Sequence, residues 1–139
     1  MPSSITNIIH GVKLIPLTKH VDTRGTLVAL EKGSEIPFPP RRIFFITVAD
    51  RCSTRAGHSS NCMELIVLLS GTCNIQFDNG QERALVSLQP IAEGLWIEAG
   101  VWLRLSNFAS NTIIAVVASM PYDKTKYFEK PNFRSSSPT

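Results

Sequence analysis

The segment between positions 55 and 64 contains Arg55, His58, Ser60 and Glu64, and the side chains of His58 and Glu64 are able to move protons. A histidine titrates near neutral pH, so it can remove and return a proton. Glu64 stands in an apolar run, and burial there would raise the pKa of its carboxyl toward the same range. His58 is therefore a candidate acid–base group, and a surface or structural histidine is the alternative. Glu64 is a second proton carrier if it faces a cavity, whereas a solvent-facing or arginine-paired carboxylate is the alternative.

Arginines spread along the chain could hold an anionic ligand such as a diphosphate. The candidates are Arg24, Arg42, Arg55 and Arg104, and Arg42 stands at the start of a β-branched and aromatic run. Because alternate strand residues share a face, Trp102 and Arg104 are expected on one face, where they could stack on a ligand. A structural ion pair or an outward-facing arginine explains each position about as well.

The composition excludes several classes of protein. The net charge of +3 is spread along the chain rather than clustered, which does not favour nucleic-acid binding. The apolar stretch at the N-terminus soon meets Lys13 and Pro16, so we expect neither a signal peptide nor a membrane anchor, and a cytoplasmic protein. The three cysteines form no Cys-x-x-Cys pair and only three histidines are present, so we expect no disulfide framework and no metal site.

The elements that must position these residues are short strands separated by turns. We expect about eight or nine of them, a spacing typical of a β-barrel or sandwich rather than of a βαβ fold. The clearest runs are 26–30, 42–48, 63–69, 73–77, 84–88, 94–97, 101–105 and 112–118. Residues 1–13 are a lead-in that could form an edge or exchanged strand, and 50–61 is expected to be a loop. We predict a single domain over 1–134, followed by a loose tail at 135–139.

An ordered set of short motifs resembles the nucleotide-sugar 3,4-ketoisomerases, cupins that act on thymidine-diphosphate-4-keto-6-deoxyglucose. The motifs span nearly the whole chain in the same order. They are Asp22–Leu27, Ile36–Phe38, Arg42–Ile46, Glu64–Gly71, Gly94–Ile97, Val101-Trp102 and Pro121–Asp123.

The resemblance implies a cupin, a double-stranded β-helix or jelly-roll barrel, that forms a homodimer through exchanged N-terminal strands. It implies a metal-independent, cofactor-free isomerase that moves the sugar ketone from C4 to C3 by proton transfer. Such enzymes belong to deoxysugar biosynthesis for surface polysaccharides or natural products. In these proteins the residue equivalent to Arg42 lies near the ligand, so the resemblance makes Arg42 the preferred residue for the diphosphate. Tyr122, after the last strand, could close the barrel mouth and carry a proton.

The chain departs from this family in the active-site loop. The family commonly reads Arg-Gly-x-His-Ala-His-Lys, whereas here the loop is Arg55-Ala-Gly-His58-Ser-Ser60-Asn. Aligned on the loop, His58 takes the place of the first histidine and Ser60 that of the second. Counted back from Gly71, His58 falls on the intervening alanine, and a slip by one residue would turn it away from the pocket. Leu103 also stands where the family has a histidine or arginine.

Two functions therefore remain open. One is a 3,4-ketoisomerase, or a related sugar epimerase, that uses His58 with Glu64 or a tyrosine. The other is a cupin that binds a nucleotide sugar or another small anion and has lost the chemistry. A metal-dependent cupin is disfavoured, because such proteins present several histidines and a carboxylate around the barrel.

Overall fold

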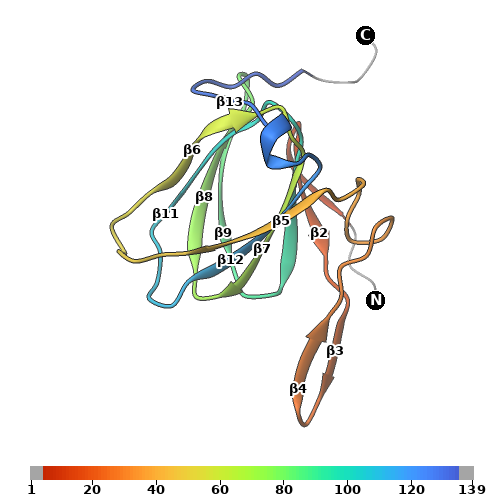
Figure 1. Cartoon of the computed structure of the whole chain (residues 1–139). Helices are drawn as coiled ribbons and strands as arrows, with labels where there is room; N and C mark the ends of the chain where they lie inside the picture. Colours follow the sequence, from red (N-terminus) through yellow and green to blue (C-terminus); the bar gives the residue numbers. More distant parts are fainter. Residues whose placement is uncertain (1–4, 135–139) are drawn as a thin grey trace.

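The apolar runs form two antiparallel β-sheets that face each other across a common core (Figure 1). The computed structural model describes residues 5–134. The larger sheet has the strand order β1 (Thr6–Ile9), β2 (Val12–Pro16), β10 (Glu93–Ile97), β7 (Glu64–Ser70), β12 (Ile113–Ala118) and β5 (Arg42–Thr47). The smaller has the order β13 (Tyr127–Phe128), β6 (Arg55–Ser60), β11 (Trp102–Ser106), β8 (Cys73–Asp78) and β9 (Arg83–Leu88). The all-β prediction is confirmed.

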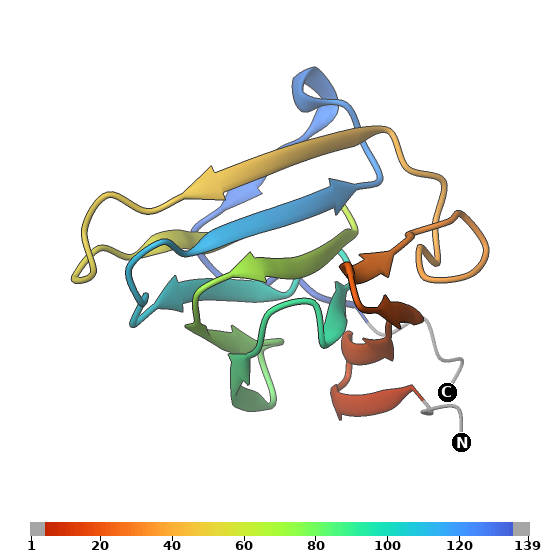
Figure 2. The ribbon, with the colours of Figure 1, turned by 90° about the horizontal axis from the view of Figure 1, so that it is seen from below.

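Strand β7 is apolar on both faces because both faces are buried. Ile66 and Leu68 point into the core between the sheets, while Leu65 and Val67 pack into a second cluster on the outer face. The segment 28–38 and the end of β2 cover that outer face. Burial on both faces explains why the sequence of β7 is a continuous apolar run. Strands β5, β12 and β7 lie side by side in the larger sheet (Figure 2).

The segment expected to be a loop at 50–61 contains strand β6, so this part of the prediction is wrong. Residues Arg55–Ser60 pair with β11 on one side and with β13 on the other. Their sequence is polar and small, and it carries no strand periodicity of its own. Partners about 45 and 70 positions away in sequence therefore impose the strand, and a local pattern cannot reveal it.

The N-terminal region is more regular than the expected lead-in. It contributes β1 and β2 to the large sheet and then β3 (Lys19–Asp22) and β4 (Gly25–Val28), which pair only with each other. This hairpin projects away from the two sheets (Figure 1). The predicted loose tail at 135–139 lies outside the described residues.

Helical structure in residues 5–134 amounts to one turn of 3-10 helix, η1 (Tyr122–Lys124). No helix in this part of the chain is long and apolar enough to cross a membrane.

Candidate active site

A small cavity between the two sheets brings together the acid–base residues predicted from sequence. Its volume is about 190 Å³, and its polar side chains are Arg55, His58, Glu64 and Tyr127. The remaining wall is apolar and comes from β5, β6, β7, β11 and β12: Phe44, Phe45, Ile46, Ala56, Ile66, Leu103, Leu105 and Val116. The volume lies below the range of about 300–1,000 Å³ typical of drug-sized ligands. The cavity thus suits a single sugar ring rather than a whole nucleotide sugar.

A β-bulge in β6 turns both Arg55 and His58 toward the cavity. In a regular strand, two residues three positions apart point to opposite faces. Here His58 pairs with Leu103 and Arg55 pairs with Leu105. The paired residues are three positions apart in β6 but only two positions apart in β11, so β6 contains one extra residue. Both leucines face the core, and their partners therefore face it too. This places His58 at the cavity wall.

The bulge requires left-handed backbone at two consecutive residues. Ala56 has φ of 65° and Gly57 has φ of 82°. Glycine adopts this conformation without penalty, whereas alanine does so at a cost of roughly 1 kcal/mol. The family's usual order, glycine directly after the arginine, would avoid that cost at position 56.

Replacing Ala56 with glycine is therefore expected to stabilise the protein by about 1 kcal/mol without moving His58. Urea unfolding of Ala56→Gly against the parent measures this change. Ala84→Gly, in β9 where the backbone is not left-handed, is the matched control and should lower stability. Destabilisation by both variants would contradict the assigned backbone at Ala56.

His58 is held as a neutral imidazole. Burial lowers the pKa of His58, with a smaller opposing effect from its own backbone, so the ring is uncharged at pH 7. Its Nδ1 is buried and has no hydrogen-bond partner among the described residues. An imidazolium would leave that N–H without an acceptor, which also disfavours the charged form. A neutral imidazole in an apolar cavity can accept a proton.

Tyr127 covers the imidazole, and the sequence did not single it out above Tyr122. The two rings have centroids 4.6 Å apart and planes tilted by 55°. Tyr127 reaches this place because β13 pairs with the end of β6, opposite Ser60. The side-chain amide of Asn61 adds two hydrogen bonds to this C-terminal segment, donating to the carbonyl of Lys124 and accepting from the N–H of Lys126. The segment crosses one end of the barrel (Figure 1).

Glu64 faces the cavity from the first position of β7. It lies opposite Ala118 of β12, which in turn lies opposite Arg42 of β5, so the three side chains form a row on the inner face. Burial raises the pKa of the Glu64 carboxyl to about 7, and the nearby positive charge of Arg42 offsets part of this effect. Glu64 can therefore exist as a neutral acid near pH 7 and can both donate and accept a proton.

Arg42 places a half-buried cation near Glu64. Its guanidinium carbon lies 5.1 Å from the ring centroid of Phe44 and 5.6 Å from that of Tyr122. Its Nε and Nη2 are buried and have no hydrogen-bond partner within residues 5–134. Buried donors without acceptors are costly, so the arrangement favours an anionic ligand that would complete these hydrogen bonds.

Tyr122 and Ser60 do not line the cavity. Tyr122 is 72% exposed and contacts Arg42 instead of His58. Ser60 is buried, and its hydroxyl donates to the carbonyl of Cys62 at 3.3 Å. Ser60 therefore does not replace the family's second histidine, and Leu103 presents no polar group at its own position. Glu64 and Tyr127 line the cavity together with His58 and are the candidates for the second proton carrier.

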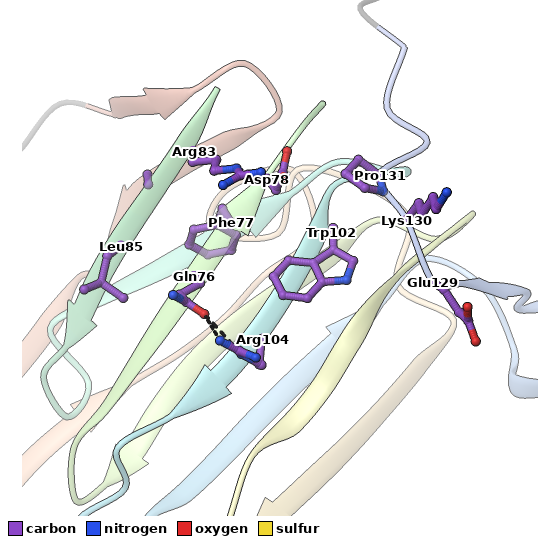
Figure 3. Close-up of a pocket in the computed structure, with 11 residues that line it drawn as sticks. Gln76, Phe77, Asp78, Arg83, Leu85, Trp102, Arg104, Glu129, Lys130 and Pro131 are labelled. Atoms are coloured by element: carbon purple, nitrogen blue, oxygen red, sulfur yellow. Dashed lines mark hydrogen bonds and ion pairs between the residues drawn. The ribbon is translucent and has the colours of Figure 1, made fainter. Parts of the chain in front are cut away.

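Trp102 and Arg104 share a face, as predicted, but it is the outer face of the smaller sheet. The guanidinium carbon of Arg104 lies 5.8 Å from the centroid of the Trp102 ring. The guanidinium donates two hydrogen bonds to Gln76 Oε1, at 2.7 and 3.1 Å (Figure 3). Both residues line an open groove of about 620 Å³ that also includes Arg83. Leu103, between them, points the other way into the cavity. Trp102 and Arg104 are thus separated by the sheet from a ligand held against His58.

Arg24 lies at the turn of the projecting β3–β4 hairpin. Its guanidinium donates to Asp22 Oδ2 at 2.6 Å, and both side chains are exposed. Arg24 does not line the cavity of its own chain. Metal ligands are likewise not gathered there, since the described part of the chain contains no cluster of three or more His, Cys, Asp or Glu residues.

The chain is similar to proteins of known function. A family profile described as FdtA: WxcM-like, C-terminal matches residues 10–136. The chain is also similar to the TDP-4-oxo-6-deoxy-alpha-D-glucose-3,4-oxoisomerase of Aneurinibacillus thermoaerophilus. The two are 33% identical over 124 residues, which cover 88% of this chain and 89% of that protein.

Two solved structures have the same fold. A point mutant of the 3,4-ketoisomerase QdtA from Thermoanaerobacterium thermosaccharolyticum, in complex with TDP-4-keto-6-deoxyglucose, has a TM-score of 0.83 at 28% identity, covering 88% of this chain and 90% of that one. The TDP-quinovose 3,4-ketoisomerase WlaRB from Campylobacter jejuni has a TM-score of 0.83 at 30% identity, covering 88% and 95%. These similarities confirm the predicted cupin fold.

Proposed function

Because this chain belongs to the family described as FdtA: WxcM-like, C-terminal, we propose that it is a 3,4-ketoisomerase of deoxysugar biosynthesis that acts on a TDP-4-keto-6-deoxyhexose. The observation that carries the proposal is the placement of a histidine and a buried carboxyl group, whose pKa is raised to about 7, in one small apolar cavity. Isomerisation of a hydroxy ketone needs two such groups, one for the proton on carbon and one for the protons on oxygen.

His58 removes the proton from C3, which is acidic because it lies next to the C4 ketone. Glu64, as a neutral acid, gives its proton to the C4 oxygen, so that an enediol forms between C3 and C4. Glu64 then takes the proton of the C3 hydroxyl while His58 returns its proton to C4. Both residues end in their starting forms and the ketone lies at C3. The change is redox-neutral within the sugar, so it needs no redox cofactor.

Arg42 binds the diphosphate in this proposal. The cavity holds about one ring, so the nucleotide must lie outside it, toward the end of the barrel where Arg42 and Tyr122 meet. The unpartnered Nε and Nη2 of Arg42 support this role, because phosphate oxygens would satisfy both.

The protein acts as a homodimer in this proposal, and as a cytoplasmic enzyme. Val21 and Leu27 on the projecting hairpin are 70% and 61% exposed, which favours burial of this hairpin against a second copy. In such a dimer, Arg24 at the turn of this hairpin would contact the second copy. Light scattering tests this point directly, and a mass of one chain at micromolar concentration would rule the dimer out.

The alternative of a binding protein without catalysis is favoured by one observation. Neither Ser60 nor Leu103 supplies the second imidazole or the polar group that the family places there. Incubation with TDP-4-keto-6-deoxyglucose, followed by proton NMR of the sugar, separates the two functions. We expect the 3-keto sugar to form at a rate proportional to enzyme concentration. Tight TDP binding without conversion would support the binding protein instead.

A further inference from the structure

Arg55 is the charged residue of the cavity that the proton transfers leave without a role. We propose that the Arg55 guanidinium binds the sugar oxygen on which negative charge develops when His58 removes the C3 proton, and that the β6 bulge exists to place the two side chains together. This inference rests on the proposed function and assigns a further catalytic residue to it.

The geometry links Arg55 to His58 rather than to the nucleotide. The two residues would face opposite sides of a regular strand, and only the extra residue in β6 brings both into one cavity. That extra residue is accommodated by left-handed backbone at Ala56, which is unfavourable for alanine. Backbone strain of this kind persists where the surrounding structure enforces it, commonly at catalytic sites.

The charge of Arg55 is available for a ligand. Within residues 5–134 its guanidinium forms no ion pair and no side-chain hydrogen bond, unlike Arg24, Arg83 and Arg104. Arg55 is an exposed residue that lines the cavity, and the rest of the cavity wall is mostly apolar, so a bound sugar would exclude part of the water that screens its guanidinium.

The chemistry requires such a donor. Removal of the C3 proton places negative charge on the C4 oxygen before Glu64 has transferred its proton completely. A positioned donor aimed at a developing oxyanion contributes about 10²–10³ in rate. An arginine is suited to this task because it stays protonated at every working pH and cannot compete with Glu64 as a proton donor.

The competing explanation is that Arg55 binds the diphosphate, and the two roles differ in their kinetics. A residue that touches only the transition state lowers kcat, whereas a diphosphate contact raises KM and weakens TDP binding. Arg55→Gln is therefore expected to lower kcat about 100-fold and to leave the dissociation constant of TDP unchanged. Arg55→Lys should recover part of kcat, because the positive charge is kept while the fork of donors is lost.

Arg51→Gln is the matched control, since it removes the same charge from the adjacent loop without altering the cavity lining. It should keep the parent kcat. Thermal unfolding of each variant verifies that the fold is intact. If Arg55→Gln weakens TDP binding by the same factor as kcat/KM, the oxyanion role is wrong and Arg55 is a diphosphate contact. Parent-like kcat in Arg55→Gln would also overturn the inference. A parent protein that does not isomerise the sugar at all would instead overturn the proposed function.

Discussion

Replacement of His58 by asparagine is expected to lower the turnover of TDP-4-keto-6-deoxyglucose by a factor of about 10²–10⁴, the usual contribution of a positioned general base. Asparagine is close to histidine in shape but cannot accept a proton at neutral pH. TDP binding should be unchanged, because the nucleotide lies outside the cavity and contacts Arg42 in the proposed complex. Steady-state kinetics with calorimetric titration of TDP measures both quantities.

His10→Asn is the control for this variant. His10 is 75% exposed in its side chain and hydrogen-bonds Glu82 on a different surface of the protein. It should retain parent activity. A His58→Asn protein that still turns over at the parent rate, with its fold intact, would remove His58 from the mechanism.

Replacement of Glu64 by glutamine is expected to affect both activity and stability. Loss of the proton carrier should lower kcat by about 10²–10⁴. In the parent, activity requires neutral His58, which prevails above its lowered pKa, and protonated Glu64, which prevails below about pH 7. The pH profile of kcat/KM is therefore bell-shaped in the parent, and its alkaline limb near pH 7 should be absent from the residual activity of Glu64→Gln.

The effect on stability has a defined sign. The pKa of Glu64 is about 7 in the folded protein, against 4.5 for an ordinary glutamate, so the folded state binds more protons between these pH values. Stability therefore falls as pH rises from about 4.5 to 7, by about 3 kcal/mol in total. Glu64→Gln removes this dependence and should be more stable than the parent at pH 8, as measured by urea unfolding.

Glu93→Gln, an exposed position at the start of β10, is the control and should change neither the pH profile nor the stability. If the parent and Glu64→Gln lose stability equally between pH 5 and pH 8, the Glu64 carboxyl is not buried as the structure has it.

The strands of this protein could be predicted wherever their residues carry the pattern themselves. The apolar run at 63–69, which forms β7, is an example. Strand β6 could not be predicted in this way, because it exists through pairing with β11 and β13.

The same distinction between local pattern and distant pairing applies to the residues of the active site. His58 and Glu64 were candidates because of their residue types, and Glu64 lies on a strand that the sequence reveals. The orientation of His58 depends on a bulge, which one inserted residue creates and which no local pattern at positions 55–60 reports. For Trp102 and Arg104 the alternation predicted a shared face, but whether that face is inside or outside depends on the closure of the two sheets. Tyr127 reaches His58 only because the C-terminal segment returns to β6.

The central claim is that the imidazole of His58 removes the C3 proton inside this cavity. Incubation of the protein with TDP-4-keto-6-deoxyglucose in deuterated buffer, with the C3 signal followed by proton NMR, tests it most directly. The parent should exchange the C3 proton for deuterium, and His58→Asn should exchange it no faster than buffer while still binding TDP. Exchange by His58→Asn at the parent rate would contradict the claim, because another group would then be the base.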